Sequence, residues 1–221
     1  MIFVSANGFG YDLIEYTKNN DIVPITCVVT LSKNAKTKMY DGIDNKCWDE
    51  LRLPILRIED INDEINFLKT LNPDFVVIAG WRQIIDKKLL NVFKNRVIGF
   101  HPTMLPFGRG KAPIINTILN DIRYSGVTLY YFNETIDGGD IIGQEPFVVE
   151  ENDYAIDVYR KATNSAKFLI KKFFPMLVNG NAPRWKQDES KVVMFGDPVC
   201  DDEDKMKRAF SYPYKLILQG N

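Results

Sequence analysis

The chain has 221 residues, of which 45% are hydrophobic and 26% charged, and its formal net charge is −1. These values are ordinary for a globular protein with a sizeable core, and they exclude an intrinsically disordered chain. The balance of 28 basic and 29 acidic residues creates no overall field that would attract nucleic acid or an anionic lipid surface. We therefore expect neither nucleic acid nor a membrane among the partners.

The cysteines and the start of the chain bear on the compartment. Cys27, Cys47 and Cys200 are widely separated, and an odd number without a disulfide framework is typical of a reducing environment. The first residues lack the basic start and the apolar length of a secretion signal, and no apolar run reaches the ~18–20 residues of a membrane span. The sequence predicts a cytoplasmic protein. We expect no metal site, because one histidine and unpaired cysteines cannot build a typical one.

The first half of the chain alternates short apolar runs with helical patterns. A turn containing Gly8 and Gly10 leads from the first strand into a helix, and apolar residues at three- and four-residue spacing predict another helix from Ile61 to Leu71. Strands are predicted over residues 1–6, 22–30, 53–58, 74–80 and 96–100. Continuously apolar strands separated by helices indicate a Rossmann-like α/β fold, with a mostly parallel sheet and helices on both faces. Ligands of such sheets bind beyond the carboxyl ends of the strands.

The second half shows a different pattern. Predicted strands at 126–132 and 141–149 flank the turn-rich segment NETIDGGD, and a long helix is expected over 155–177. Asn179-Gly180 is a typical helix stop. The residues beyond it are expected to form strands and turns with one short helix near 204–210. We therefore predict a main α/β domain over 1–180 and a small C-terminal strand and turn appendage over 181–221, packed on that domain.

Two residues stand out as candidates for chemistry. His101 is the only histidine, and it opens the proline-rich loop HPTMLPFGRGKAP just past a predicted strand. Asp137 follows 36 residues later, in ETIDGGDII between two predicted strands. A histidine satisfied by local hydrogen bonds and an aspartate that serves a turn are the structural alternatives. The functional interpretation places both at one cleft, where the carboxylate orients the imidazole.

Glycines and cations near the predicted strand ends are candidates for binding an anion. Gly8 and Gly10 form a Gly-x-Gly, but Leu13 stands where a dinucleotide fingerprint needs its third glycine. A turn that approaches a phosphate is the remaining functional interpretation. Arg109 and Lys111 precede a predicted helix, and two cations at a helix N-terminus suit an anionic substrate. The alternative is that these loop cations are only solvated.

Taken together, these segments resemble the formyltransferase family that uses 10-formyltetrahydrofolate. The family's Asn-x-His-Pro-Ser-Leu-Leu-Pro motif stands here as GFHPTMLP over 99–106, and its Asp-x-Gly motif matches IDGG at Asp137. The strand and loop AGWRQII resembles the family's pterin-binding wall. The resemblance covers residues 1 to about 149. It implies the family's fold, and 10-formyltetrahydrofolate as the co-substrate of a formyl transfer.

The resemblance also implies a mechanism. An amine attacks the formyl carbon of the donor and gives a tetrahedral intermediate with a negative oxygen. His101 would donate to this oxygen or relay the amine proton, and Asp137 would hold His101 in its working state. Gly99 departs from the pattern, because the family has asparagine there, and losing one oxyanion donor can reduce turnover ~10²–10³-fold. Another group or a water then substitutes, the reaction is slow, or the protein binds without catalysis.

By the same resemblance, one segment lines the pterin and the backbone of a second meets its polar edge. These residues are Trp81, Arg82, Gln83, Ile84 and Ile85, together with Asn133, Glu134 and Ile136. For Trp81 and Ile84, core packing is the alternative. Cations for phosphates and aromatic rings for a base would hold a nucleotide-linked substrate. The expected substrate-binding residues are Gly8, Gly10, Arg109, Gly110, Lys111, Arg208, Tyr212 and Tyr214.

Three branches of the family compete for the acceptor. Methionyl-tRNA formyltransferase is expected to carry a further C-terminal domain, and glycinamide ribonucleotide formyltransferase a different tail. The loop with GRG and the tail segments WKQDES and KRAFSYPYK resemble the branch that acts on nucleotide-linked amino sugars, although VCDDEDK departs from it. The resemblance favours a homodimeric sugar N-formyltransferase of surface polysaccharide (O-antigen) synthesis that uses a dTDP-linked amino-deoxysugar. Glycinamide ribonucleotide as acceptor, or a non-catalytic folate or nucleotide-sugar binding homologue, are the alternatives. For Tyr212 and Tyr214, packing of the appendage or a subunit contact is the alternative.

Overall fold

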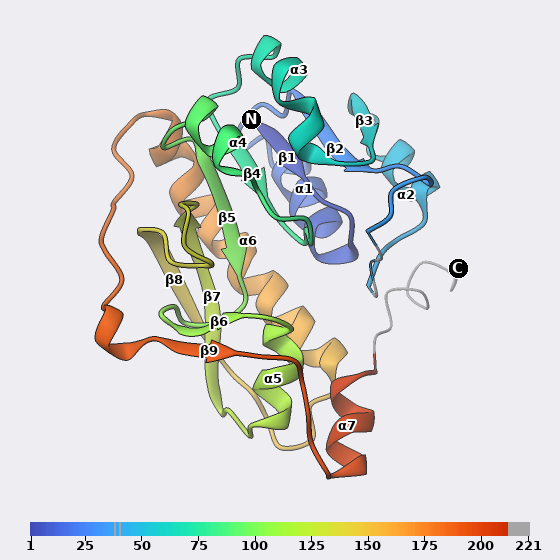
Figure 1. Cartoon of the computed structure of the whole chain (residues 1–221), viewed down its shortest axis with the longest axis vertical. Helices are drawn as coiled ribbons and strands as arrows, with labels where there is room; N and C mark the ends of the chain where they lie inside the picture. Colours follow the sequence, from blue (N-terminus) through green and yellow to red (C-terminus); the bar gives the residue numbers. More distant parts are fainter. Residues whose placement is uncertain (38, 40, 212–221) are drawn as a thin grey trace. The chain divides into compact units, whose positions relative to one another are not determined.

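The computed structural model describes residues 1–37, 39 and 41–211 (Figure 1). The chain forms two compact units, Met1–Gly99 and, of the described residues, 100–211. The larger sheet has the strand order β3-β2-β1-β4-β5-β7-β8, and a second sheet contains β6 and β9. This order confirms the predicted Rossmann-like, mostly parallel α/β fold. The predicted domain division at residue 180 stays a prediction.

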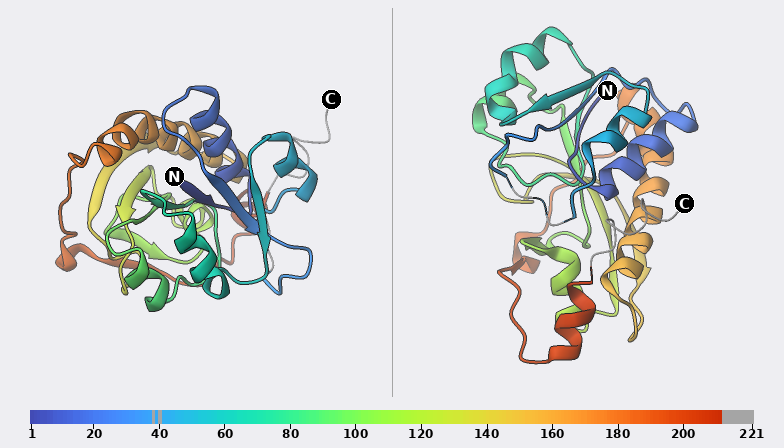
Figure 2. Two further views of the ribbon diagram at one scale, coloured as in Figure 1. Left: turned by 90° about the horizontal axis from the view of Figure 1, so that it is seen from above. Right: turned by 90° about the vertical axis from the view of Figure 1, so that its right-hand side faces the viewer.

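The first unit is built on parallel strands. Its elements are β1 (Ile2–Val4), α1 (Gly8–Asn19), β2 (Cys27–Leu31), α2 (Asn45–Glu50), β3 (Ile55–Ile58), the 3-10 helix η1 (Ile61–Glu64), α3 (Ile65–Thr70), β4 (Val76–Ile78), α4 (Lys87–Val92) and the start of β5 (Val97–His101). Each neighbouring pair of strands is parallel. Helix α1 covers one face of these strands and helices α3 and α4 cover the other (Figure 2). Two-sided cover explains why β1, β2 and β4 are buried throughout.

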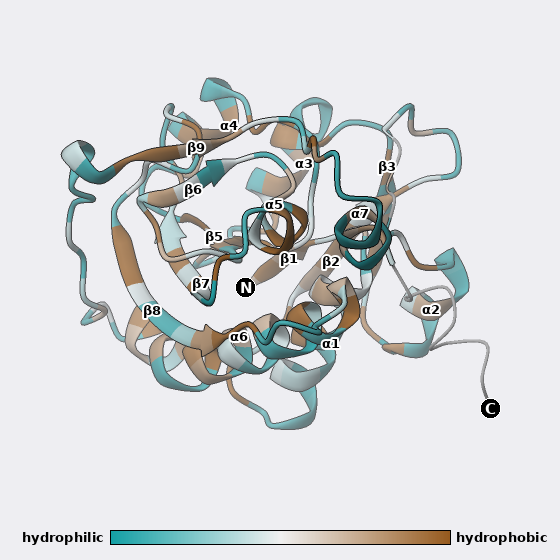
Figure 3. Ribbon diagram, turned by 90° about the horizontal axis from the view of Figure 1, so that it is seen from below, coloured by the Kyte–Doolittle hydropathy of each residue, from teal (hydrophilic) through white to brown (hydrophobic). Residues whose placement is uncertain are grey.

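The second unit combines an antiparallel pair with a long helix. Its elements are β6 (Phe107–Gly110), α5 (Pro113–Leu119), β7 (Tyr124–Tyr131), β8 (Ile141–Val148), α6 (Ala155–Val178), the 3-10 helix η2 (Glu189–Lys191), β9 (Val193–Phe195) and α7 (Glu203–Ala209). Strand β7 pairs antiparallel with β8, and β6 pairs parallel with β9. Helix α6 packs so closely on β8 that a Cβ at Gly143 would lie 2.1 Å from the Phe173 ring. Figure 3 shows β9 mostly hydrophobic and α7 mostly hydrophilic.

The predicted turn at Gly8 and Gly10 is wrong, because both glycines belong to the first turn of α1. The side chain of Asn7 caps this helix by accepting a hydrogen bond from the Gly10 N–H at 3.1 Å. A Cβ at Gly10 would lie 1.9 Å from the Ser5 hydroxyl and 2.5 Å from the Ala79 carbonyl oxygen. Close packing of the helix against neighbouring strand ends, with no phosphate needed, is therefore sufficient to require glycine at residue 10.

Two elements go beyond the sequence analysis. Strand β6 lies in the segment expected to be a loop, because its sequence FGRG has no alternating apolar pattern and gains its partner only from β9. Helix α4 is a short helix that the periodicity did not indicate. Over the described residues, no helix has the length and apolar character needed to cross a membrane.

Candidate active site

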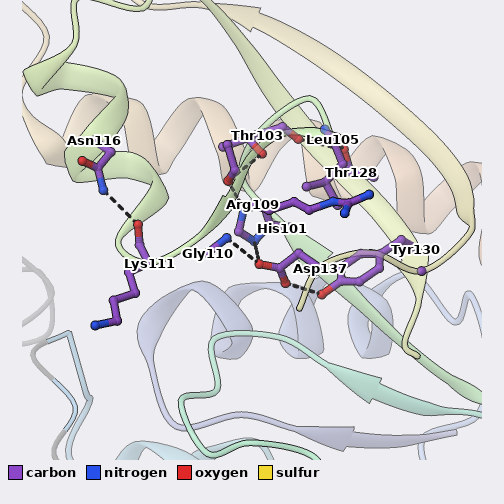
Figure 4. Close-up of polar contacts among 12 residues, drawn as sticks. His101, Thr103, Leu105, Arg109, Gly110, Lys111, Asn116, Thr128, Tyr130 and Asp137 are labelled. Carbon is purple, nitrogen blue, oxygen red and sulfur yellow. Dashed lines mark hydrogen bonds and ion pairs between the residues drawn. The ribbon is translucent and has the colours of Figure 1, made fainter. Parts of the chain in front are cut away.

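His101 is the last residue of β5, and its side chain is almost completely buried (Figure 4). Its Nε2 lies 2.7 Å from the carbonyl oxygen of Gly108. Because a carbonyl oxygen only accepts, this contact assigns the hydrogen to Nε2. The other ring nitrogen, Nδ1, faces the Oδ2 atom of Asp137 at 3.6 Å. The sequence-predicted pair is therefore brought together, at a separation slightly longer than a hydrogen bond.

Both oxygens of the Asp137 carboxylate are held by donors. The backbone N–H of Gly110 donates to Oδ2 at 2.8 Å, and the hydroxyl of Tyr130 donates to Oδ1 at 2.7 Å. Asp137 adopts a positive φ of 49°, a conformation that aspartate accepts more readily than most residues. Figure 4 shows the carboxylate between Tyr130, Gly110 and His101. Two donated hydrogen bonds fix the orientation of the carboxylate beside the imidazole.

Tyr130 is a site residue that the sequence analysis missed. It lies in β7, is 3% exposed, and stacks on Phe132 with ring centroids 5.0 Å apart. Burial raises the pKa of its phenol well above the ordinary value of 10, and the charge of Asp137 and the hydrogen bond to it raise the pKa further. The phenol therefore stays protonated and donating. Nothing local distinguishes Tyr130 from the neighbouring Tyr131, so no sequence signal identifies it.

This pKa predicts an alkaline loss of stability that depends on Tyr130. Because the folded-state pKa lies above the unfolded value of 10, the native state keeps its proton after the unfolded chain has lost it. The free energy of unfolding therefore falls as the pH rises above about 10. In Tyr130→Phe we expect a shallower fall, measured by urea unfolding between about pH 8 and about pH 11. Tyr124→Phe is the control, since Tyr124 lies on the same strand but is 82% exposed. Equal alkaline slopes in Tyr130→Phe and the wild type would contradict this assignment.

Arg109 is bound by two side chains of its own chain, and its predicted contact with an anionic substrate stays a prediction. It is 2% exposed, and its Nε and Nη2 donate to Gln187 Oε1 at 3.0 and 2.8 Å. Its Nη1 and Nη2 also donate to the Glu189 carboxylate at 3.2 and 2.7 Å. This hydrogen bond lowers the pKa of Glu189, with the positive charge of Arg109 as a further cause. The charge of the guanidinium is thus paired within the chain, by residues 78 and 80 positions away in sequence.

Three other predicted substrate-binding residues each bind a different part of the chain. Gly110, with a φ of 105°, uses its N–H on Asp137. Lys111 is exposed, and its Nζ pairs with Asp197 at 2.9 Å. Arg208 donates to the backbone carbonyl oxygen of Glu151, at the wall of a cavity lined by α5, the segment before β7, the segment after β8 and α7. The predicted Tyr212 and Tyr214 lie outside the described residues.

The segment predicted to line the pterin lies in the first unit. The Gln83 amide accepts from one backbone N–H and donates to one backbone carbonyl and one threonine hydroxyl, so it anchors this segment. Ile85 belongs to the core, whereas Ile84 is 81% exposed. The indole N–H of Trp81 is buried without a hydrogen-bond partner among the described residues. Arg82 interacts within the chain. Contact of these residues with a pterin stays a prediction.

The loop before Asp137 is internally braced. Asn133 accepts from the Thr135 N–H at 2.9 Å and donates to the Gly138 carbonyl oxygen at 3.2 Å. Glu134 also interacts within the chain, and Ile136 is 66% exposed. These contacts form a compact turn that ends at the carboxylate. Contact of the backbone of Asn133, Glu134 and Ile136 with a pterin stays a prediction.

The sequence is similar to that of known formyltransferases. The Formyl transferase family matches residues 1–172, most of the chain. The methionyl-tRNA formyltransferase of Lysinibacillus sphaericus (strain C3-41) is 33% identical over 159 residues, which cover 71% of this chain and 50% of that protein. The chain thus spans about half the length of the curated relatives it matches.

Solved structures share the fold. The N-formyltransferase from Helicobacter canadensis, in complex with folinic acid and dTDP-3-aminofucose, superposes with a TM-score of 0.71 at 20% identity, covering 95% of this chain and 79% of that one. Phosphoribosylglycinamide formyltransferase from Anaplasma phagocytophilum gives a TM-score of 0.70 at 19% identity, covering 90% of this chain and 98% of that one. Since the family match also includes the strand that carries His101 and the loop that carries Asp137, the chain belongs to the formyl transferase family.

Proposed function

We propose that this protein transfers the formyl group of 10-formyltetrahydrofolate to the amino group of a nucleotide-linked, dTDP-type amino-deoxysugar. The observation that carries the proposal is the pairing of the buried His101 with the partly buried Asp137, whose carboxylate is fixed by Gly110 and Tyr130. A fold neighbour that holds folinic acid and a dTDP-linked aminosugar supports both substrates. Cytoplasmic location, a homodimer and a role in surface polysaccharide synthesis are further predictions.

The chemistry needs a group that moves one proton. The uncharged amine attacks the formyl carbon, a new C–N bond forms, and the bond from that carbon to the folate nitrogen then breaks. The proton lost by the amine ends on the departing folate nitrogen, so the products are a formamide and tetrahydrofolate. Nδ1 of His101 is the ring nitrogen available for this transfer, because Nε2 is used on the Gly108 carbonyl oxygen. Asp137 stabilises the charged imidazole as the proton passes.

Two features bear on how the substrates would be held. Gly99 contributes no side-chain donor to the tetrahedral oxygen, so catalysis at full rate would need another group or a bound water there. The buried indole N–H of Trp81 has no partner among the described residues, and an unsatisfied buried donor is destabilising. A polar edge of the pterin would satisfy this donor. Within its segment, Trp81 is therefore the predicted pterin contact with the most support, from its unpaired indole N–H.

One observation favours a second acceptor. The phosphoribosylglycinamide formyltransferase of Anaplasma phagocytophilum is covered over 98% of its own length. Glycinamide ribonucleotide also carries a primary amine and a phosphate, and the same pair could transfer the proton of that amine. Gly99 favours a third possibility, in which folate or a nucleotide sugar binds without turnover.

The test is a formylation assay. Purified protein is mixed with 10-formyltetrahydrofolate and a panel of nucleotide-linked amino sugars, with glycinamide ribonucleotide as a separate acceptor. Mass spectrometry identifies any acceptor that gains one formyl group. We expect a formylated dTDP-amino sugar. A formylated glycinamide ribonucleotide alone would replace the proposed acceptor, and no product with folate still bound would favour the binding protein.

A further inference from the structure

The side-chain amide of Gln187 uses its full hydrogen-bonding capacity: its oxygen accepts two hydrogen bonds and its NH₂ group donates two. It lies in the segment between α6 and η2 and is 8% exposed. Its Oε1 accepts from Nε and Nη2 of Arg109, and its Nε2 donates to the carbonyl oxygens of Asp137 and Gly139, each at 2.8 Å. Only an oxygen suits the guanidinium and only an NH₂ suits two carbonyls, so the orientation of the amide is fixed.

The two carbonyls belong to the turn that carries the catalytic carboxylate. Asp137 has a φ of 49°, which a residue with a side chain adopts only when its surroundings hold it. Gly139 is equally constrained, because a Cβ there would lie 1.6 Å from the Tyr131 carbonyl oxygen. Gln187 therefore binds the backbone at both ends of the three-residue turn 137–139, and the first side chain of this turn, Asp137, faces His101.

The guanidinium belongs to the strand that contacts both catalytic side chains through its backbone. Gly108 receives the Nε2 hydrogen of His101, and Gly110 donates its N–H to Asp137. Arg109 stands between them and is bound to Gln187. One amide thus joins the backbone segment 108–110 to the turn 137–139, the two segments that set where the imidazole and the carboxylate lie.

We propose that Gln187 is a positioning residue that fixes the distance between His101 Nδ1 and the Asp137 carboxylate. Its effect on turnover rests on the proposed formyl transfer, but its effect on geometry does not. Glu189, which also binds Arg109, reaches neither carbonyl of the turn and is 70% exposed at its side chain. It therefore provides a matched control for loss of contacts to Arg109 alone.

The kinetic test compares Gln187→Glu, Gln187→Met and Glu189→Gln in the full chain. Gln187→Glu keeps the shape and the acceptor for Arg109, but it places an oxygen against two carbonyl oxygens. We expect kcat to fall at least about tenfold in both Gln187 variants, since a displacement of about 1 Å can reduce turnover about 10²-fold. KM should stay within about twofold, and the pH profile of kcat should change. In Glu189→Gln, kcat should stay within about twofold, because residue 189 contacts neither carbonyl of the turn and the glutamine oxygen can still accept from Arg109.

A second measurement needs no activity. Because His101 is the only histidine, the Hε1 resonance of its ring is unambiguous in an NMR spectrum. In Gln187→Glu, or in Gln187→Met if the charged variant does not fold, we expect this resonance to shift at constant pH. Amide hydrogen exchange should also accelerate over 137–140. Glu189→Gln should match the wild type in both measurements.

The outcomes separate the two proposals. If the wild type formylates no acceptor but the resonance and exchange change as expected, the proposed function fails and the positioning role of Gln187 stands. If a folded Gln187 variant keeps the wild-type resonance and exchange, or the wild-type kcat where the protein is active, the positioning role is overturned. Equal changes in Glu189→Gln would also overturn it, because the effect would then pass through Arg109 alone.

Discussion

Replacing His101 by asparagine is expected to reduce kcat for formyl transfer about 10²–10⁴-fold while leaving the affinity for 10-formyltetrahydrofolate unchanged. The asparagine side chain is one bond too short to reach the Gly108 carbonyl oxygen, which Nε2 of the imidazole contacts at 2.7 Å. It cannot accept and release a proton as Nδ1 does. Steady-state kinetics with the identified acceptor and equilibrium titration of the folate measure the two quantities.

Thr103→Val is the matched control for His101→Asn. Thr103 is buried in the same loop, and its hydroxyl makes only a long contact of 3.4 Å to the Gly108 carbonyl oxygen. We expect kcat within a few-fold of wild type. Unchanged turnover in His101→Asn would remove the imidazole from the mechanism. An equal loss in Thr103→Val would assign the effect to packing of the loop.

Replacing Gly139 by alanine should reduce kcat about 10²-fold. The added Cβ would lie 1.6 Å from the Tyr131 carbonyl oxygen, so the turn has to move by far more than a side chain can absorb. Because Gly139 follows Asp137 by two residues and its carbonyl oxygen binds Gln187, this movement displaces the carboxylate from His101. Kinetics of the purified variant, together with thermal unfolding, report the change.

Gly196→Ala controls for the replacement of a glycine as such. An added Cβ there meets nothing within 4 Å, and no strained backbone angle applies. We expect wild-type kcat and an unfolding temperature within about a degree or two, as for a surface substitution. Wild-type turnover in Gly139→Ala would show that the turn can shift without moving Asp137, and the proposed pairing with His101 would lose its structural basis.

Local sequence patterns predicted much of the fold. The apolar run at 74–80 and the periodicity of 155–177 correspond to β4 and α6, because burial on both faces of a sheet and on one face of a helix leaves a local trace. His101 and Asp137 are candidates from their places after a strand and between two strands, and the resemblance of GFHPTMLP and IDGG to the family motifs predicts their roles. Strand β6 was not predicted, since FGRG becomes a strand only through pairing with β9, more than eighty residues later.

The residues that support His101 and Asp137 could not be predicted from local sequence either, because their contacts join distant segments. Arg109 in a glycine-rich loop has the local appearance of an anion-binding cation, and only the fold reveals that Gln187 and Glu189 occupy it. Tyr130 donates to Asp137 from a strand in which tyrosines are common by propensity alone. Sequence motifs that resemble the family predict His101 and Asp137 as the reacting groups, whereas the contacts that orient these side chains join segments distant in sequence.

The backbone of Asp137 has a consequence for how this protein could change under selection. A residue held at a φ of 49° gives glycine or asparagine a conformational advantage over aspartate at the same position. Selection for thermal tolerance would weigh this backbone advantage against loss of the hydrogen bonds that Gly110 and Tyr130 donate to the carboxylate. Asparagine keeps one acceptor oxygen and tolerates the same φ. An aspartate that persists at residue 137 in place of asparagine would therefore record a requirement for the charge, and a laboratory stabilisation campaign should exclude this position from its library.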